Sequence, residues 1–464
     1  MKKNKLFKIL AITVLVIALL TWLIPAGNYS GEFVNAGIQR LGFIDFCQYM
    51  VLPFFQSMFI EVLLFLLAVG AFYGVLSKTG AYKNSIEKLA KKFKKKGTLV
   101  LIIIAFLIAA LSSVGGYGLL LFAFIPMLIS IILLMGYSKI TAFLITFGSM
   151  LIGIMGATFG GIDATLSMLN LTYTAQIFFK LGLFVVSFVV FILFTLKIAQ
   201  KKSKDEKFED KFLGTETSKK KPIALWIAIA IVFVLFILGC TKWNESFGIE
   251  VFNKFHTWLM GISIKDFAIF SNILGTSTLA FGAWSYFQMS VVLIVAALII
   301  AAIYKVNVCK SVVEGVKVIV KPALLVVFSY AVLIIIVNSG IFTTLMSYVL
   351  TPLKKFNVIS AMLSVIINIV GSFLHVELPY VANFYLPYLA GTFTESYVPA
   401  ILNVMTQATY GLTMFVAPTS LFLLLGLTYL DIPYCEWLKK IWKLVVALLL
   451  IVMILIVIML IVLQ

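Results

Sequence analysis

The chain carries many uninterrupted apolar runs of about 20 residues, and this feature limits its possible folds more than any other. A helix of that length crosses the hydrocarbon core of a bilayer, which is roughly 30 Å thick, and satisfies its own backbone hydrogen bonds there. Because 62% of the 464 residues are hydrophobic and only 12% are charged, a soluble core is implausible. We therefore predict an all-α polytopic membrane protein.

The lysines indicate which loops face the cytoplasm. The formal net charge is +18, but eight lysines fall between Lys78 and Lys96 and eight more between Lys201 and Lys221, both between apolar runs. This is the positive-inside pattern of membrane loops, so we expect no nucleic-acid partner. The first run, 9–25, has no small-residue cleavage site and is predicted to remain as a span. The N-terminus is then cytoplasmic, in a multi-pass protein of the cell membrane.

An internal repeat becomes visible when the sequence is shifted by 260 residues. The stretch SSVGGYG at 112–118 then aligns with SFLHVEL at 372–378, and Thr158 aligns with Pro418. Gly80 aligns with Gly340, and each of these glycines precedes an amphipathic stretch. The two halves therefore share one order of elements.

The repeat predicts a re-entrant hairpin and a broken span in each half. The hairpins are expected at 99–135 and 358–391, and the broken spans at 140–172 and 398–430, interrupted by GATFGG and by Pro418. Orienting the spans by their lysines gives about nine crossings and opposite directions for the two halves. The predicted regions are a first inverted repeat at 1–200, a cytoplasmic lysine-rich linker at 201–222, an extra span with an outer loop at 223–285, and a second inverted repeat at 286–464.

Paired broken helices in inverted repeats are typical of secondary transporters. Unwound backbone is tolerated at membrane depth only where it is buried in protein or lines a wet cavity, and its free N–H and C=O groups can then bind cargo. The alternative is that glycine and proline only kink packed helices, as they often do in membranes.

Four stretches resemble one carrier family. They are TWLIPAGNY at 21–29, FLLAVGAFYGVLSKTGA at 65–81, VVEGVKVIVKPALLVV at 312–327 and APTSLFLLLGLTYLDIPYCEWLKKI at 417–441. They look like the YfcC and DcuC-like carriers of the C4-dicarboxylate anaerobic carrier family, within the ion-transporter superfamily. The resemblance implies transport of dicarboxylates or amino acids by an elevator-type homodimer.

The chain departs from the family pattern at the two hairpins and the two breaks. In the first half, Ser112, Ser113, Gly115 and Gly116 replace a paired-glutamate segment, and Gly160, Gly161, Ile162 and Asp163 replace an Asn-Pro-Phe motif. In the second half, His375 and Glu377 stand near the family's serine and glutamine, and Met414 replaces an asparagine. Gln407, Pro418 and Thr419 are retained. This divergent member is thus expected to keep the scaffold with an altered cargo site.

The predicted substrate and ion site combines the hairpin tips with the helix breaks. Its members are Ser112, Ser113, Gly115, Gly116, Thr158, Gly160, Asp163, His375, Glu377, Gln407, Pro418 and Thr419. An acid at the centre of a span costs roughly 2.5–3.5 kcal/mol on insertion scales, which makes Glu377 the strongest candidate.

Each of these side chains also has a structural interpretation. The tip with His375 and Glu377 could reach the hydrated interface, and Asp163 could cap the half-helix that follows it. Serine and threonine hydroxyls also bond within their own helix.

The charges near the predicted site favour a cationic or zwitterionic cargo. The site contains acids and no arginine, and Lys180 is expected at the outer part of the span 174–198. We therefore predict a secondary active transporter, an ion-coupled carrier or exchanger for a small charged metabolite, and favour an amino acid as the cargo. The alternatives are a C4-dicarboxylate carrier and a passive channel or facilitator on the same scaffold. Na⁺ or H⁺ is the expected coupling ion and no cofactor is expected. No HExxH motif or paired catalytic aspartates support an intramembrane enzyme.

Overall fold

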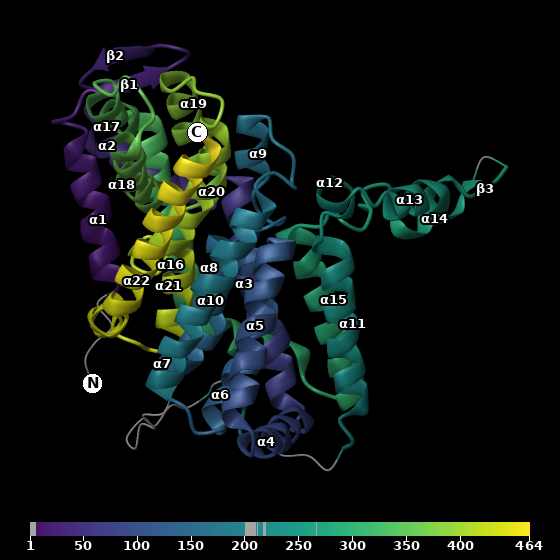
Figure 1. Cartoon of the computed structure of the whole chain (residues 1–464). Helices are drawn as coiled ribbons and strands as arrows, with labels where there is room; N and C mark the ends of the chain where they lie inside the picture. Colours follow the sequence, from purple (N-terminus) through teal and green to yellow (C-terminus); the bar gives the residue numbers. More distant parts are fainter. Residues whose placement is uncertain (1–5, 200–209, 211, 217–219, 266) are drawn as a thin grey trace.

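The computed structural model describes residues 6–199, 210, 212–216, 220–265 and 267–464 as a bundle of helices (Figure 1). The elements of the first half are α1 (Leu6–Leu20), β1 (Ala26–Tyr29), β2 (Phe33–Gly37), α2 (Phe43–Val51), the 3-10 turn η1 (Leu52–Phe54), α3 (Ser57–Lys78), α4 (Ala81–Lys94), α5 (Gly97–Gly115), the 3-10 segment η2 (Gly118–Ala123), α6 (Ile125–Leu134), α7 (Lys139–Phe143), the π-helical segment η3 (Leu144–Gly148), α8 (Ser149–Met155), α9 (Asp163–Leu169) and α10 (Ile177–Ala199).

The remaining elements begin with a helical pair and the lateral arm that joins its two members. They are α11 (Ile223–Cys240), α12 (Trp243–Phe247), α13 (Val251–Gly261), β3 (Ser263–Ile264), β4 (Phe267–Ala268), α14 (Ile269–Leu274), α15 (Tyr286–Tyr304), α16 (Val308–Ser339), α17 (Ile341–Leu350), α18 (Val358–His375), α19 (Leu378–Thr392), α20 (Val398–Thr413), α21 (Leu421–Tyr429) and α22 (Tyr434–Leu463). β1 and β2 form an antiparallel hairpin, as do β3 and β4. Figure 1 shows α12 to α14 projecting sideways from the bundle.

A close crossing of α3 and α16 forms the centre of one packed unit. Gly70 and Gly74 lie one turn apart on α3, and Gly315 of α16 approaches them so closely that a Cβ on Gly315 would lie 2.1 Å from the Gly70 carbonyl oxygen. Small residues at this spacing let helix backbones approach within a membrane, where packing replaces the hydrophobic effect between helices. α15 packs on α3 and α11 packs on α15, so these helices form a scaffold beside the interrupted helices.

The two interrupted regions contain helix pairs and broken helices at the predicted positions. α5 ends at Gly115 and α18 at His375, and each is followed after a short turn by a returning helical segment. The chain is not helical at 156–162, between α8 and α9, or at 414–420, between α20 and α21. α5 packs on α8, α18 on α20, and α20 on α8, which joins the interrupted regions into one body.

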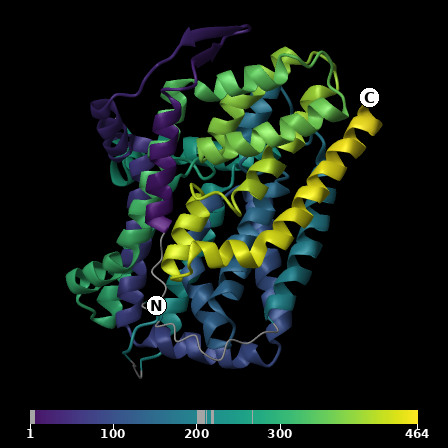
Figure 2. The ribbon, with the colours of Figure 1, turned by 90° about the vertical axis from the view of Figure 1, so that its left-hand side faces the viewer.

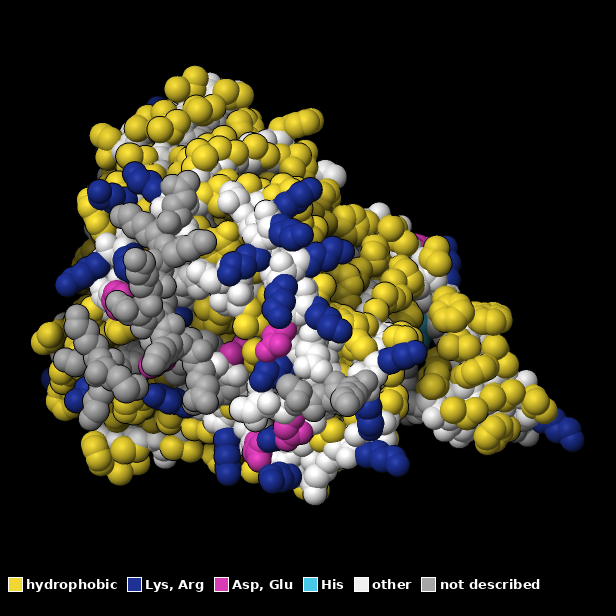
Figure 3. Space-filling view, turned by 90° about the horizontal axis from the view of Figure 1, so that it is seen from below, with side chains coloured by type: hydrophobic (Ala, Val, Ile, Leu, Met, Phe, Trp, Pro, Cys, Tyr) yellow, Lys and Arg dark blue, Asp and Glu magenta, His cyan; other side chains and the backbone are white. Residues whose placement is uncertain are grey.

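The amphipathic helices lie at opposite ends of the bundle. α4 lies at the lower end in Figures 1 and 2, and α17 at the upper end beside the β1–β2 hairpin. Seen from below, the lower end carries many lysine side chains across its centre, with hydrophobic side chains around the periphery (Figure 3). We call it the lysine-rich end. This placement is the one expected of inverted halves, while the two-fold relation itself and the re-entrant entry of the hairpins stay predictions.

The apolar helices confirm the membrane class. Eight helices in the described part of the chain are long and apolar enough to cross a bilayer, namely α3, α5, α10, α11, α15, α16, α18 and α22. The spans predicted at 223–240 and 286–304 coincide with α11 and α15. Two of the eight, α5 and α18, are arms of predicted hairpins, whereas α1 and the two broken spans consist of shorter helices. Most of the predicted linker 201–222 and Lys2, Lys3 and Lys5 lie outside the described residues.

The glycine crossing yields a stability prediction. Gly74→Val should lower the free energy of unfolding by about 1–3 kcal/mol, because the new side chain meets the backbone of Gly315 and Ser311. Thermal melting of the detergent-solubilised protein measures the effect. Gly182→Val is the matched control, since a Cβ at Gly182 on the exposed side of α10 meets no atom within 4 Å. Equal melting of the two variants would contradict the role of the crossing.

The placement of α17 yields an orientation prediction. A single cysteine in place of exposed Lys354, which follows α17, should react with an impermeant thiol reagent from outside intact cells. A cysteine in place of exposed Lys91 on α4 should react only after lysis. Both tests need a background without the four native cysteines. The reverse labelling pattern would refute the lysine-based orientation.

Candidate functional site

The first hairpin tip is bonded directly to the first helix break. The carbonyl oxygen of Ser113 accepts hydrogen bonds from the backbone N–H groups of Thr158, Phe159 and Gly160 at 3.0, 3.3 and 3.2 Å. The Ser113 hydroxyl donates to the Gly156 carbonyl at 2.7 Å. Unpaired backbone groups are costly in a membrane. Here the single residue Ser113 binds three N–H groups and one carbonyl group of the first break.

Glycine is required where this tip and this break touch. A Cβ on Gly160 would lie 1.8 Å from the Gly116 nitrogen, and one on Gly116 would lie 2.1 Å from the Gly161 nitrogen. Gly116 and Gly161 also have positive φ, at 63° and 72°, which disfavours other residues. The segments GGYG and GATFGG therefore fit together backbone against backbone.

The second tip and the second break are joined by side chains instead. Thr419 donates its hydroxyl to the Phe373 carbonyl at 2.7 Å, and Tyr410 of α20 donates to the Val376 carbonyl at 3.0 Å. Ser420 accepts from the Leu423 N–H at 3.4 Å and caps α21. The buried Pro418 lies within this break and cannot continue a helix.

A strained turn separates His375 from Glu377. Val376 has φ 63° and ψ −44°, and the Glu377 N–H donates to the His375 carbonyl at 2.6 Å. This is a three-residue γ-turn, a conformation that is costly for a β-branched residue. Because of this turn, His375 is the last residue of α18 and Glu377 is the N-cap of α19, and their side chains lie in different surroundings.

One glutamine connects the two interrupted regions. Gln407 of α20 is fully buried, and its Nε2 donates to the Ala157 carbonyl in the first break at 2.7 Å. One turn further along α20, Gly411 packs against the backbone of Met155 at the end of α8. The α20–α8 contact thereby places all four chain interruptions around one volume.

That volume is a cavity of about 220 Å³, which we call the central cavity. It is lined by both tips, both breaks and two scaffold helices. The lining residues are Met58, Val62, Ser112, Gly116, Gly118, Leu119, Ile154, Ala157, Gly160, Gly161, Tyr286, Glu377, Leu378, Pro379, Tyr410, Leu421 and Phe422. Among these described residues, Glu377 alone carries a charge.

Glu377 is held by a tyrosine of the scaffold. The hydroxyl of Tyr330 on α16 donates to Glu377 Oε1, and Tyr330 is itself fully buried and stacked on Phe59. Glu377 also occupies the N-cap position of α19, where the helix dipole favours a negative charge. The carboxylate is therefore oriented, with its second oxygen available to the cavity.

The start of α21 supplies hydrogen-bond donors to the same cavity. Leu421 and Phe422 are the first two residues of α21, and both line the cavity. Their backbone N–H groups have no partner among the described residues, as is usual in a first helical turn. Such N–H groups bind carboxylates well. The cavity thus presents one anionic side chain and one anion-binding helix end.

His375 lines a different space, which we call the upper cavity. This cavity has a volume of about 340 Å³ and lies between β1, α16, α17 and α19. His375 is fully buried, its Nδ1 lies 3.0 Å from the Gly371 carbonyl oxygen, and its ring stacks on Phe384. Its Nε2 has no described partner. The interpretation of His375 as a hydrogen-bonded structural residue therefore fits the geometry better than a shared site with Glu377.

Asp163 lies outside the central cavity. Its carboxylate accepts from the Tyr173 hydroxyl and forms an ion pair with Lys242 at 2.8 Å, which ties α9 to the lateral arm. It makes no side-chain capping bond to α9. Within the described residues, no group of three or more histidine, cysteine, aspartate and glutamate side chains could hold a metal ion.

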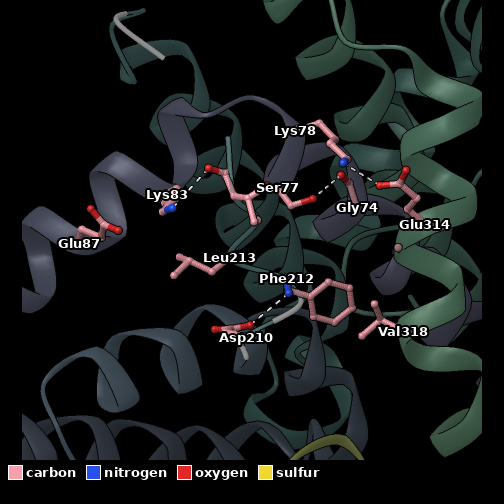
Figure 4. Close-up of a pocket in the computed structure, with 13 residues that line it drawn as sticks. Gly74, Ser77, Lys78, Lys83, Glu87, Asp210, Phe212, Leu213, Glu314 and Val318 are labelled. Atoms are coloured by element: carbon pink, nitrogen blue, oxygen red, sulfur yellow. Dashed lines mark hydrogen bonds and ion pairs between the residues drawn. The ribbon is translucent and has the colours of Figure 1, made fainter. Parts of the chain in front are cut away.

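A lower cavity of about 570 Å³ opens at the lysine-rich end (Figure 4). Lys78 in this cavity forms ion pairs with Glu314 at 2.7 Å and with Glu216 at 3.7 Å, and Lys83 donates to the Thr215 carbonyl at 3.4 Å. Burial raises the pKa of the Asp210 carboxyl, and the hydroxyl of Ser130, which donates to it, opposes this rise. Asp210 thereby anchors its segment against α6, so we assign this cavity to packing of that segment.

The predicted site residues fall into three groups. Ser112, Gly116, Gly160 and Glu377 line the central cavity. Ser113, Gly115, Thr158, Gln407, Pro418 and Thr419 belong to its supporting tips, breaks and α20. His375 and Asp163 lie elsewhere. The prediction missed Met58, Tyr286, Tyr330 and Tyr410, although tyrosines within otherwise apolar spans were a usable signal.

The bond between the second break and the second tip can be tested alone. Thr419→Val keeps the side-chain shape and removes the donor to Phe373, so the free energy of unfolding should fall by about 1 kcal/mol. Thr13→Val is the matched control, because the Thr13 hydroxyl bonds only within α1, at 3.0 Å from the Ile9 carbonyl oxygen. Thermal melting in detergent compares the two, and an unchanged Thr419→Val variant would show that the bond contributes nothing.

Comparison with known proteins agrees with the resemblance found in the sequence. The family model for DcuC, described as C4-dicarboxylate anaerobic carrier, matches residues 4–461. Among solved structures, the YdaH transporter of Alcanivorax borkumensis is similar with a TM-score of 0.42 and 11% identity, over 99% of this chain and 98% of that one. No curated protein matches the chain. The family match spans nearly the whole sequence, and the chain therefore belongs to the C4-dicarboxylate anaerobic carrier family.

Proposed function

We propose that this secondary transporter is an ion-coupled carrier or exchanger that binds a small amino acid in the central cavity. The observation that carries the proposal is that Glu377 and the residues Leu421 and Phe422, whose N–H groups have no partner among the described residues, line one cavity of about 220 Å³. A zwitterion complements both, with its ammonium on Glu377 and its carboxylate on the start of α21.

The architecture suggests how the cargo would cross the membrane. The central cavity lies between the scaffold helices α3 and α15 and the body formed by the tips and breaks. Movement of that body against the scaffold would carry the cavity from one side to the other, as in alternating access. The homodimer that the family resemblance implies is part of this proposal.

A C4-dicarboxylate is the second candidate, favoured by the family match. A dicarboxylate has two anionic groups, so it would need two anion-binding elements and no cation-binding carboxylate. The N-terminus of α19, beside Glu377, is the second helix start at the cavity, after that of α21. A thermal-shift screen with single L-amino acids and with succinate, fumarate and malate separates the candidates. Stabilisation by amino acids alone supports the proposal, and stabilisation by dicarboxylates alone overturns its cargo.

Glu377→Gln provides the direct test in transport. Loss of the charge removes a charge-assisted hydrogen bond to the cargo, and uptake should fall roughly tenfold to hundredfold, corresponding to about 1.5–3 kcal/mol. The measurement is uptake of radiolabelled L-amino acids into proteoliposomes, at matched levels of inserted protein. Glu436→Gln, at a partly exposed carboxylate that pairs with Lys440 at 3.5 Å, should transport normally.

Two results would contradict this assignment. Wild-type uptake in Glu377→Gln would remove Glu377 from the cargo site. Uptake that is unchanged after both Na⁺ and proton gradients are collapsed, and that shows no counterflow, would indicate a passive facilitator.

A further inference from the structure

Lys180 is a fully buried lysine. It lies in the first turn of α10, its side chain is fully buried, and its Nζ has no hydrogen-bond partner among the residues that the structure describes. Removing an ammonium from water is costly unless oxygen atoms replace the lost hydration. A lysine is a poor choice for filling apolar space, so this position calls for a functional explanation.

The contacts of α10 place Lys180 at the level of the first break. Four residues before it, Gln176 accepts a hydrogen bond from Asn403 Nδ2 at 2.8 Å. Four residues after it, Phe184 packs directly against Gly156 at the start of the break. Lys180 and Phe184 are four apart on α10 and share a face, while Gln176 immediately precedes the helix and its carbonyl accepts from the Lys180 N–H at 3.1 Å. Lys180 therefore lies between these two contacts along the chain.

The same level of α20 offers unpaired oxygen atoms. Asn403 and Gln407 are one turn apart on α20, and both are fully buried. Their amide nitrogens are bonded, to Gln176 and to the Ala157 carbonyl, while Asn403 Oδ1 and Gln407 Oε1 have no described partner. The unpartnered amine of Lys180 on α10 and the unpartnered amide oxygens of Asn403 and Gln407 on α20 thus lie at the level of the first break.

Carboxylates do not neutralise this lysine from the helices around it. α5, α7, α8 and α20 contain no aspartate or glutamate, and the titratable groups on them are Lys139, at the start of α7, and Tyr410, bonded to the Val376 carbonyl. On α22 the titratable side chains, from Tyr434 to Lys443, lie in its first third. That part of α22 lies toward the lower end in Figures 1 and 2, whereas α10 begins near α9 at the upper end. The nearest acid along the chain, Asp163, is already paired with Lys242.

We propose that Lys180 is the proton-binding group that couples transport to the proton gradient, an inference that rests on the proposed carrier function. In one state of the carrier the amine takes a proton from one side of the membrane, and the resulting ammonium is held by the amide oxygens of Asn403 and Gln407. In the other state the proton leaves the nitrogen to the opposite side, and the neutral amine remains. One proton crosses the membrane in each cycle, and the N–H bond of Lys180 is the only covalent bond that forms and breaks.

The connection to the cargo runs through Gln407. Its amide holds the Ala157 carbonyl at 2.7 Å, and Ala157 lines the central cavity. When Lys180 is protonated, its ammonium attracts the amide oxygen of Gln407. A shift of that amide would move the first break, which forms one wall of the cavity. Protonation and cargo binding are linked in this way without a direct contact between Lys180 and the cargo.

The test compares Lys180→Met with Lys197→Met in proteoliposomes. Lys197 lies in the last turn of the same helix and is exposed, which makes it the matched control. The probes are a radiolabelled mixture of L-amino acids and, in a parallel arm, radiolabelled succinate. We expect an inward proton gradient to drive accumulation in wild type and Lys197→Met. In Lys180→Met this accumulation should be lost, while exchange of labelled for unlabelled probe continues.

A second measurement does not depend on the cargo. The difference in melting temperature between wild type and Lys180→Met should change with pH, because proton binding to a native-state group alters stability, whereas Lys197→Met should follow wild type. Accumulation driven by the proton gradient in Lys180→Met would overturn the inference. Accumulation in wild type that is driven by a Na⁺ gradient and not by a proton gradient would overturn it as well. So would identical pH profiles of wild type and Lys180→Met. Failure of both probes in all forms, with the pH difference intact, would instead refute the proposed carrier function and leave Lys180 as a proton-binding group.

Discussion

The whole arrangement depends on the hydrogen-bonding needs of unwound backbone inside a membrane. At the first break these needs are met by one carbonyl, that of Ser113, which receives three N–H groups from residues 158–160. At the second break they are met by hydroxyls, with Thr419 bonded to Phe373 and Tyr410 to Val376. Each break is therefore locked to the hairpin of its own half, and the two locked units meet along α8 and α20.

Several buried polar groups have no partner among the described residues, and the proposed chemistry rests on those beside the central cavity and α10. Glu377 and the first N–H groups of α21 face the central cavity, while His375 faces the upper cavity on the other side of the γ-turn. Lys180, Asn403 and Gln407 each have an unpartnered polar atom outside the central cavity, and we propose that they act together. In our proposals, cargo recognition and ion coupling belong to separate residues that are connected through the Gln407–Ala157 hydrogen bond.

The sequence predicted the positions of the chain interruptions well, because glycine and proline act locally on backbone conformation. Gly116 and Gly160 stand where the structure requires glycine, and the spans at 223–240 and 286–304 are reproduced. It failed where the outcome depends on side-chain direction. The turn at Val376 separates the side chains of His375 and Glu377, which stand two positions apart in the sequence, and the full burial of Lys180 could not be read from its own helix. Tyr330 was missed because its partner lies 47 residues away.

The most direct test of the central claim is a structure of the protein in lipid nanodiscs, determined by electron cryo-microscopy with a saturating concentration of a transported amino acid. Density for the amino acid between Glu377, Gly160 and Leu421 is the predicted result. Density confined to the upper cavity beside His375 or to the lower cavity beside Lys78 would contradict the account.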